Sequence, residues 1–138
     1  TSTPVIVYVY PTVPPPTSPP VIIYVYPTPQ PAQTPPQFIY YYYSLINNRQ
    51  YDLAWSFLTP NFIARNNSPE EGGYAGYVNY WNTVQSVVVT SVVVLSQRGT
   101  TASVRVYATY NYFSGDSYDT QLVFYLVYDY TRGTWLFQ

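Results

Sequence analysis

Proline is distributed unevenly along this chain, and that distribution sets the first limit on the fold. Twelve of the fourteen prolines lie in the first 36 residues, and no charged residue precedes Arg49. Proline fixes φ and removes an N–H donor, so regular structure is confined to the intervals between prolines. The sequence therefore predicts a proline-rich extended tail over residues 1–36 and a domain over residues 37–138, which is long enough for one core.

The tail contains two near copies of one peptide. "PVIVYVYPT" at residues 4–12 and "PVIIYVYPT" at residues 20–28 are identical at eight of nine positions. Their β-branched and aromatic residues predict two short strands that are apolar on both faces. Because the spacer at residues 13–19 is proline-rich and stiff, we expect the copies not to pair as a tight hairpin. We predict that they add to the sheets of neighbouring copies of the chain. The predicted assembly residues are Val5, Ile6, Val7, Tyr8, Val9, Tyr10, Val21, Ile22, Ile23, Tyr24, Val25 and Tyr26.

Hydrophobic spacing changes beyond residue 36 from a strand period to a helix period. Helical spacing predicts three helices, and Thr59-Pro60 predicts an N-cap that opens a turn through Phe62 and Ile63. Long β-branched runs with glycine-containing turns then predict an antiparallel meander that ends in a short strand. The fold class predicted is α+β, with three N-terminal helices packed on a curved antiparallel sheet of about four strands. The predicted helices cover residues 37–48, 51–58 and 74–84, and the long strands cover 85–97, 101–113 and 118–130.

Three stretches of the domain resemble a known superfamily. They are "YYYYSLINNRQYDLAWSFLTPNF", "YVNYWNTVQSVVV" and "LVYDYTRGTW". Together they resemble the NTF2-like superfamily, the cone-shaped α+β domain that includes SnoaL-type enzymes and ketosteroid isomerases. The resemblance covers residues 37–138 and implies a cavity enclosed by the curved sheet, with an Asp/His or Asp/Tyr set inside it in enzymatic members. The candidate pocket residues are Tyr42, Trp55, Tyr77 and Trp81, whose simpler interpretation is core packing.

Catalytic chemistry has little support in the composition. The chain has no His, Cys or Lys, which removes the commonest general bases and covalent nucleophiles. An Asp–Tyr pair could transfer a proton, but the acids fit helix starts, turns and a solvated loop at residues 66–73. We therefore expect no catalytic residue, no metal and no cofactor. The acids are Asp52, Glu70, Glu71, Asp116, Asp119 and Asp129.

The net charge of the chain and the residue at position 1 bear on the partners and the location of the protein. Five scattered Arg and a net charge of -1 argue against nucleic acid, and no apolar run is long enough for a transmembrane helix. The absence of Met at position 1 indicates a removed leader, as in a secreted protein, so we expect an extracellular or cell-surface location. Glycans are candidate additions. The candidate acceptors are Asn66, Thr12, Thr17, Ser18 and Thr28.

Three functions stay open on these grounds. The first is a secreted structural subunit that self-assembles head to tail into a fibre or array through the tail strands. The second is a tethered NTF2-like domain that binds a small ligand or acts as an enzyme. The third is an accessory domain of a larger surface or signalling protein, with the proline-rich run as its linker.

Overall fold

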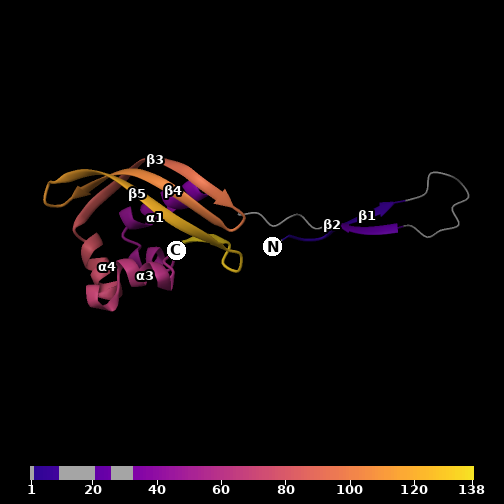
Figure 1. Cartoon of the computed structure of the whole chain (residues 1–138), viewed down its shortest axis with the longest axis horizontal. Coiled ribbons are helices and arrows are strands. Elements are labelled where there is room, and N and C mark those ends of the chain that lie inside the picture. The colour runs from indigo at the N-terminus through magenta and orange to yellow at the C-terminus, as the bar shows by residue number, and fades with distance from the viewer. Residues whose placement is uncertain (1, 10–20, 26–32) are drawn as a thin grey trace, which may run out of the picture. The chain divides into compact units, whose positions relative to one another are not determined.

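A computed structural model describes residues 2–9, 21–25 and 33–138 of the chain (Figure 1). The chain divides into two compact units, Thr1–Gln30 and Pro31–Gln138. We call the described part of the first unit the hairpin and the second unit the domain. Among the described residues, no helix is long and apolar enough to cross a membrane.

The hairpin consists of β1 (Val5–Val9) and β2 (Val21–Val25), paired antiparallel with Val7 opposite Ile23. The expectation that the two copies would not pair with each other is therefore wrong. Eleven residues separate the strands, which is ample length to reverse the chain. The repetition itself makes the pairing favourable, because every position of one copy meets a β-branched or aromatic partner in the other. Tyr10 and Tyr26, the last residue of each predicted assembly strand, lie outside the described residues.

No side chain of the hairpin whose exposure is described is buried. Opposite residues in an antiparallel pair share a face, so one face carries Val and Ile and the other carries Ile and Tyr. The described large apolar side chains of both faces are 41–57% exposed. A two-stranded sheet of this kind has no core of its own. These exposed side chains are Val5, Ile6, Val7, Tyr8, Val21, Ile22 and Ile23.

The domain begins with helices α1 (Pro35–Asn47) and α2 (Tyr51–Trp55). A capping box starts α1: the Gln37 backbone N–H donates to the Thr34 hydroxyl, and the Thr34 backbone N–H donates to the Gln37 side chain. Pro35 and Pro36 lie in the first helical turn, where a missing N–H costs no hydrogen bond. The last two prolines assigned to the tail by sequence thus belong to the helix.

The predicted set of three helices is wrong, because the domain has four α-helices and a 3₁₀ turn among its described residues. The stretch predicted as a turn is α3 (Pro60–Asn66), followed by the 3₁₀ turn η1 (Pro69–Glu71) and α4 (Gly73–Trp81). The cap itself is as predicted, since the Phe62 backbone N–H donates to the Thr59 hydroxyl at 3.2 Å. With Pro60 at the first position, that cap starts seven helical residues rather than a single turn. The predicted fold class was three N-terminal helices on a curved antiparallel sheet of about four strands, preceded by an extended tail with two short strands. It is corrected to an α+β fold of four short helices, a four-stranded sheet and a separate two-stranded sheet.

The four-stranded sheet is an antiparallel meander in the order β3-β4-β5-β6. Figure 1 shows the long strands curving over α1, with α3 and α4 on the same side of the sheet. Even-numbered residues of β4 and β5 face the helices, and this inner face holds the core with the apolar side of α1. The strands are β3 (Val84–Arg98), β4 (Thr101–Tyr112), β5 (Ser117–Asp129) and β6 (Thr134–Phe137).

Both outer strands of this sheet are tied to the helical segments. At β3, the Asn47 side chain donates to the Val87 carbonyl at 2.9 Å and accepts from the Val87 N–H at 2.8 Å. At β6, Phe137 forms a parallel bridge with Leu58, which follows α2. These contacts hold the helices against the two edges of the sheet and leave the middle of the inner face opposite α3 and α4.

Candidate functional site: an aromatic pocket

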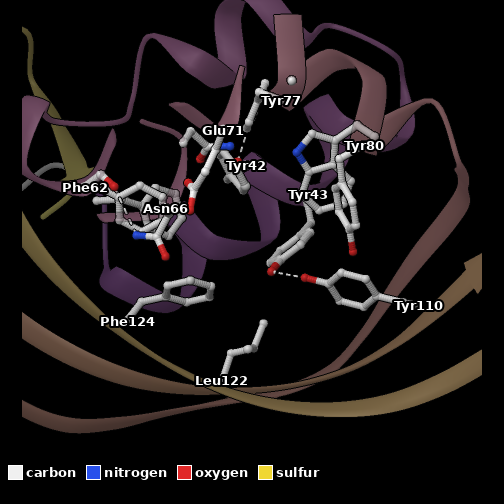
Figure 2. A pocket seen from close by; sticks show the side chains of 14 residues that line it. Tyr42, Tyr43, Phe62, Asn66, Glu71, Tyr77, Tyr80, Tyr110, Leu122 and Phe124 are labelled. Carbon is white, nitrogen blue, oxygen red and sulfur yellow. Dashed lines mark hydrogen bonds between the residues drawn. The ribbon is translucent and has the colours of Figure 1, made fainter. Parts of the chain in front are cut away.

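A cavity of about 430 Å³ lies between the helices and the inner face of the sheet (Figure 2). Figure 1 shows the sheet curving over the helices, and side chains from both layers line the space between them. Leu122 and Phe124 line the cavity from β5 and Tyr110 from β4. On the helical side the lining residues are Tyr42, Tyr43, Phe62, Asn66, Asn67, Glu71, Gly76, Tyr77, Tyr80 and Trp81, and Phe137 of β6 completes the wall.

Two tyrosine pairs form the polar part of the wall. The Tyr42 and Tyr77 hydroxyl oxygens are 2.7 Å apart, and so are those of Tyr43 and Tyr110. Figure 2 shows the hydroxyl groups of the second pair pointing toward each other. In each pair, one hydroxyl donates its proton to the oxygen of the other. The accepting hydroxyl can then donate its own proton to another group.

These phenols are held in the neutral form. Burial raises the pKa of Tyr42 well above its usual value, and the neighbouring phenol of Tyr77 adds to the effect. Burial likewise raises the pKa of Tyr43 and of Tyr110 above the usual range. The deep wall therefore offers ring faces and neutral hydroxyl groups.

The rim of the cavity is formed by α3 and η1. Asn66 and Asn67 lie at the end of α3, and Glu71 ends η1. The Ser68 backbone N–H donates to the Glu71 Oε2 at 3.3 Å in a second capping box, which fixes the carboxylate beside the cavity. Figure 2 shows the Glu71 side chain next to Asn66 and directed into the space between Asn66 and Tyr43.

Close packing of two backbones also holds Glu71 at the rim. A Cβ atom at Gly76 would collide with the carbonyl oxygen of Glu71, so only glycine lets α4 pass this close to η1. The turn between the two elements is made by Gly72, at a φ of 97°. The glycines in this segment thus bring the acid at the end of η1 to the aromatic residues of α4.

Three of the four candidate pocket residues line the cavity. Tyr42, Tyr77 and Trp81 do so, and Trp55 is absent from the lining. The indole of Trp55 packs instead against the rings of Tyr74 and Tyr77, with centroids 5.3 and 5.0 Å apart.

Other parts of the site were missed by sequence reasoning. Glu71 was assigned to a solvated loop, and it is indeed exposed, but its place in the cavity lining was not predicted. Phe62 was assigned to a turn. The inward position of Leu122 and Phe124 follows from strand alternation, but alternation alone does not tell which stretch of an inner face stands clear of the helices.

The predicted acids Asp52, Asp119 and Asp129 do not line the cavity. Asp52 is in the first turn of α2. Asp129 accepts a hydrogen bond from the Thr131 backbone N–H in the turn between β5 and β6, as expected for an acid that stabilises this turn. Asp119 accepts from the Thr109 hydroxyl on the outer face of the sheet. Asn66, the candidate N-glycosylation site, is exposed at the rim, and its Nδ2 donates to the Phe62 carbonyl. The tail acceptors Thr12, Thr17, Ser18 and Thr28 lie outside the described residues.

Comparison with known proteins adds one likeness. No protein-family model matches the chain. Over 96 residues the chain is 31% identical to Serine/threonine-protein kinase PknA of Nostoc sp. strain PCC 7120, which is 69% of this chain and 17% of that kinase. The chain thus spans about a sixth of the length of the curated relative it matches.

Proposed function

We propose that the domain Pro31–Gln138 is a non-catalytic small-molecule-binding domain of a larger signalling protein. The observation that carries the proposal is the aromatic cavity, whose volume of about 430 Å³ falls within the range of small-molecule sites. Apolar walls with a few polar groups at fixed positions are the usual composition of such sites. The resemblance to the NTF2-like superfamily, whose sheet encloses a cavity, supports the same assignment.

The likeness to a protein kinase supports the proposal that the domain belongs to a larger signalling protein. The matched part covers 17% of PknA, so it corresponds to a small segment of a much longer protein. A protein-kinase catalytic domain uses a lysine to contact ATP, and this chain has no lysine. Both observations support the proposal that the chain is an accessory segment of a kinase-containing protein, with the proline-rich stretch as its linker.

A binding role fits the cavity better than catalysis. The buried phenols stay protonated, so they do not serve as bases near neutral pH. Of the described residues that line the cavity, Glu71 alone carries a charge.

The test uses two probes of the same shape, 4-tert-butylphenol and 4-(trimethylammonio)phenol, added to the 138-residue chain. We expect at least one to bind, and Leu122→Trp to abolish that binding because the indole fills the cavity. Val123→Trp is the matched control, since Val123 is the next residue of β5 and is exposed on the outer face. The proposal fails if neither probe binds at millimolar concentration, or if Leu122→Trp binds as well as the control.

A second candidate function is the secreted structural subunit that assembles through its tail strands. It is favoured by one observation, the exposed Val, Ile and Tyr side chains on both faces of the hairpin. Since β1 and β2 pair with each other, a neighbouring copy would add to the outer edge of this two-stranded sheet. Negative-stain imaging tests this candidate: fibres that disappear when residues 1–30 are deleted support it, and separate particles of the full chain contradict it.

A further inference from the structure

The described cavity lining carries a negative charge and no positive charge. Of the fourteen described lining residues, one is an acid, none is basic, and nine are aromatic. The described contacts of three arginines lie elsewhere: the guanidinium of Arg49 donates to the Val84 carbonyl, that of Arg65 to the Gln138 carbonyl and that of Arg132 to the Ser56 carbonyl. An anionic ligand would lose its hydration in this cavity without gaining a counter-charge, and it would face the carboxylate of Glu71.

From this arrangement we propose that the pocket binds an organic monocation, an amine or quaternary ammonium group carried on a ring or a short apolar body. The inference rests on the proposed binding function and narrows it to a chemical class. Glu71 would supply the counter-charge at the rim, and the aromatic wall would take the apolar body.

The aromatic wall is suited to a cation as well as to an apolar group. Four tyrosine rings lie around the indole of Trp81. Their centroids are 5.1 Å away for Tyr80, 5.9 Å for Tyr110, 6.2 Å for Tyr77 and 6.4 Å for Tyr43. The faces of such rings carry partial negative charge, and groups of them hold quaternary ammonium ions in other proteins. The neutral phenol oxygens add lone pairs and no positive charge.

The acid is held in place independently of any ligand. Its Oε2 accepts the Ser68 N–H, and the approach of Gly76 fixes the backbone of η1 against α4. A carboxylate that is positioned before the ligand arrives loses little side-chain freedom on binding, which favours affinity.

The experiment compares 4-(trimethylammonio)phenol with 4-tert-butylphenol, which differ by the replacement of a charged nitrogen by carbon. Their dissociation constants are measured by calorimetry on the 138-residue chain. We expect the cation to bind about tenfold or more tightly than the neutral probe, the scale of a desolvated cation–π contact with a nearby counter-charge.

Two variants separate the charge from the structure around it. Glu71→Gln removes the charge and keeps an acceptor for the Ser68 N–H, because glutamine also closes a capping box. Glu70→Gln removes the same charge from the preceding residue, which is exposed like Glu71 but does not line the cavity. We expect the preference for the cation to fall to about threefold in Glu71→Gln, leaving the aromatic contribution, and to be unchanged in Glu70→Gln.

The outcomes distinguish a failure of the cation inference from a failure of the proposed binding function. Equal affinity for the two probes, with binding lost in Leu122→Trp, overturns the cation inference and leaves the binding function standing. Preference for the cation that is reduced equally by Glu70→Gln and Glu71→Gln also overturns it, because the charge would then act from a distance. Absence of binding by both probes overturns the inference together with the proposed function.

Discussion

The hairpin and the four-stranded sheet are built from the same kinds of residue, yet their side chains meet different surroundings. Val7 in the hairpin is 41% exposed, whereas Val104 and Val106 in β4 are fully buried under α1. The difference lies in what covers each strand, since a strand of Val, Ile and Tyr is apolar in either place. The domain supplies its own cover through a helix whose apolar stripe matches the inner face of the sheet.

The edges of the two sheets differ in the same way. In the domain, the Asn47 side chain makes two hydrogen bonds to the backbone of β3, and Leu58 bridges to β6. In the described part of the hairpin, each strand has its partner strand on one side alone. An apolar pair with open edges is suited to contact with another surface, while the domain is suited to hold a small molecule inside.

The largest expected difference between the domain and the hairpin is in the free energy of unfolding that is lost when one apolar side chain is removed from each. Phe38→Ala should lower the free energy of unfolding by about 3–5 kcal/mol, because Phe38 is fully buried between Phe57 and Phe137. Val7→Ala in the hairpin should change it by less than about 0.5 kcal/mol. Urea unfolding followed by tryptophan fluorescence measures both. A large loss in Val7→Ala would show that the hairpin packs against a core.

The next effect is the response of the domain to alkaline pH. The pKa of buried Tyr42 and that of buried Tyr43 are raised, so in the folded state these phenols keep protons that the unfolded chain releases near pH 10. The unfolded state then binds fewer protons, and stability falls as pH rises above 10, by about 1.4 kcal/mol per pH unit for each phenol. Chemical unfolding at pH 9, 10 and 11 measures the slope.

Tyr43→Phe provides the control for that slope. It removes one of the phenols and should make the loss of stability above pH 10 shallower, although the unpaired hydroxyl of Tyr110 lowers stability at every pH. A stability that stays constant from pH 9 to pH 11 in the unmodified chain would contradict the burial of the tyrosine pairs.

A smaller effect tests the edge of the sheet. Asn47→Ala removes both hydrogen bonds to Val87 and should cost about 1–2 kcal/mol. The amide of Val87 should then exchange its hydrogen faster, as seen by NMR. Asn79→Ala, on the exposed side of α4, is the matched change and should be close to neutral. Unchanged exchange at Val87 in Asn47→Ala would mean that the side chain does not protect this edge.

The smallest effect is expected from deleting residues 1–30. The domain keeps its own start, where the Trp135 Nε1–H donates to the Gln33 carbonyl at 2.7 Å. Its thermal midpoint should therefore shift by no more than about 2 °C, as measured by circular dichroism. A fall of ten degrees or more would show that the hairpin stabilises the domain and would remove the contrast between the two regions.

Much of the local structure could be predicted from the sequence, because it depends on neighbouring residues. The Thr59 cap, the glycine-containing strand turns and the helical stripe through Tyr42 are local signals of this kind. The extent of α3 was missed, since a cap marks where a helix starts and says little about where it ends. The pairing of β1 with β2 was missed because the proline-rich spacer was given more weight than the match between the two copies.

The site was predictable only in part for a related reason. Tyr77 and Trp81 share a helix face, so their joint position follows from spacing. Glu71 reaches the cavity through the close approach of η1 to α4 at Gly76, a contact between backbones that has no periodic pattern in the sequence. Leu122 and Phe124 line the cavity because the sheet curves, which depends on all its strands together.

The most direct test of the central claim is an NMR titration of the 138-residue chain with 4-(trimethylammonio)phenol. Binding in the aromatic pocket predicts saturable shifts of the Trp81 indole N–H and of the Glu71 and Gly76 amides, with no change at the amides of Val7 and Ile23 in the hairpin. Shifts confined to the hairpin, with the pocket signals unmoved, would contradict the account and locate binding on the exposed strands.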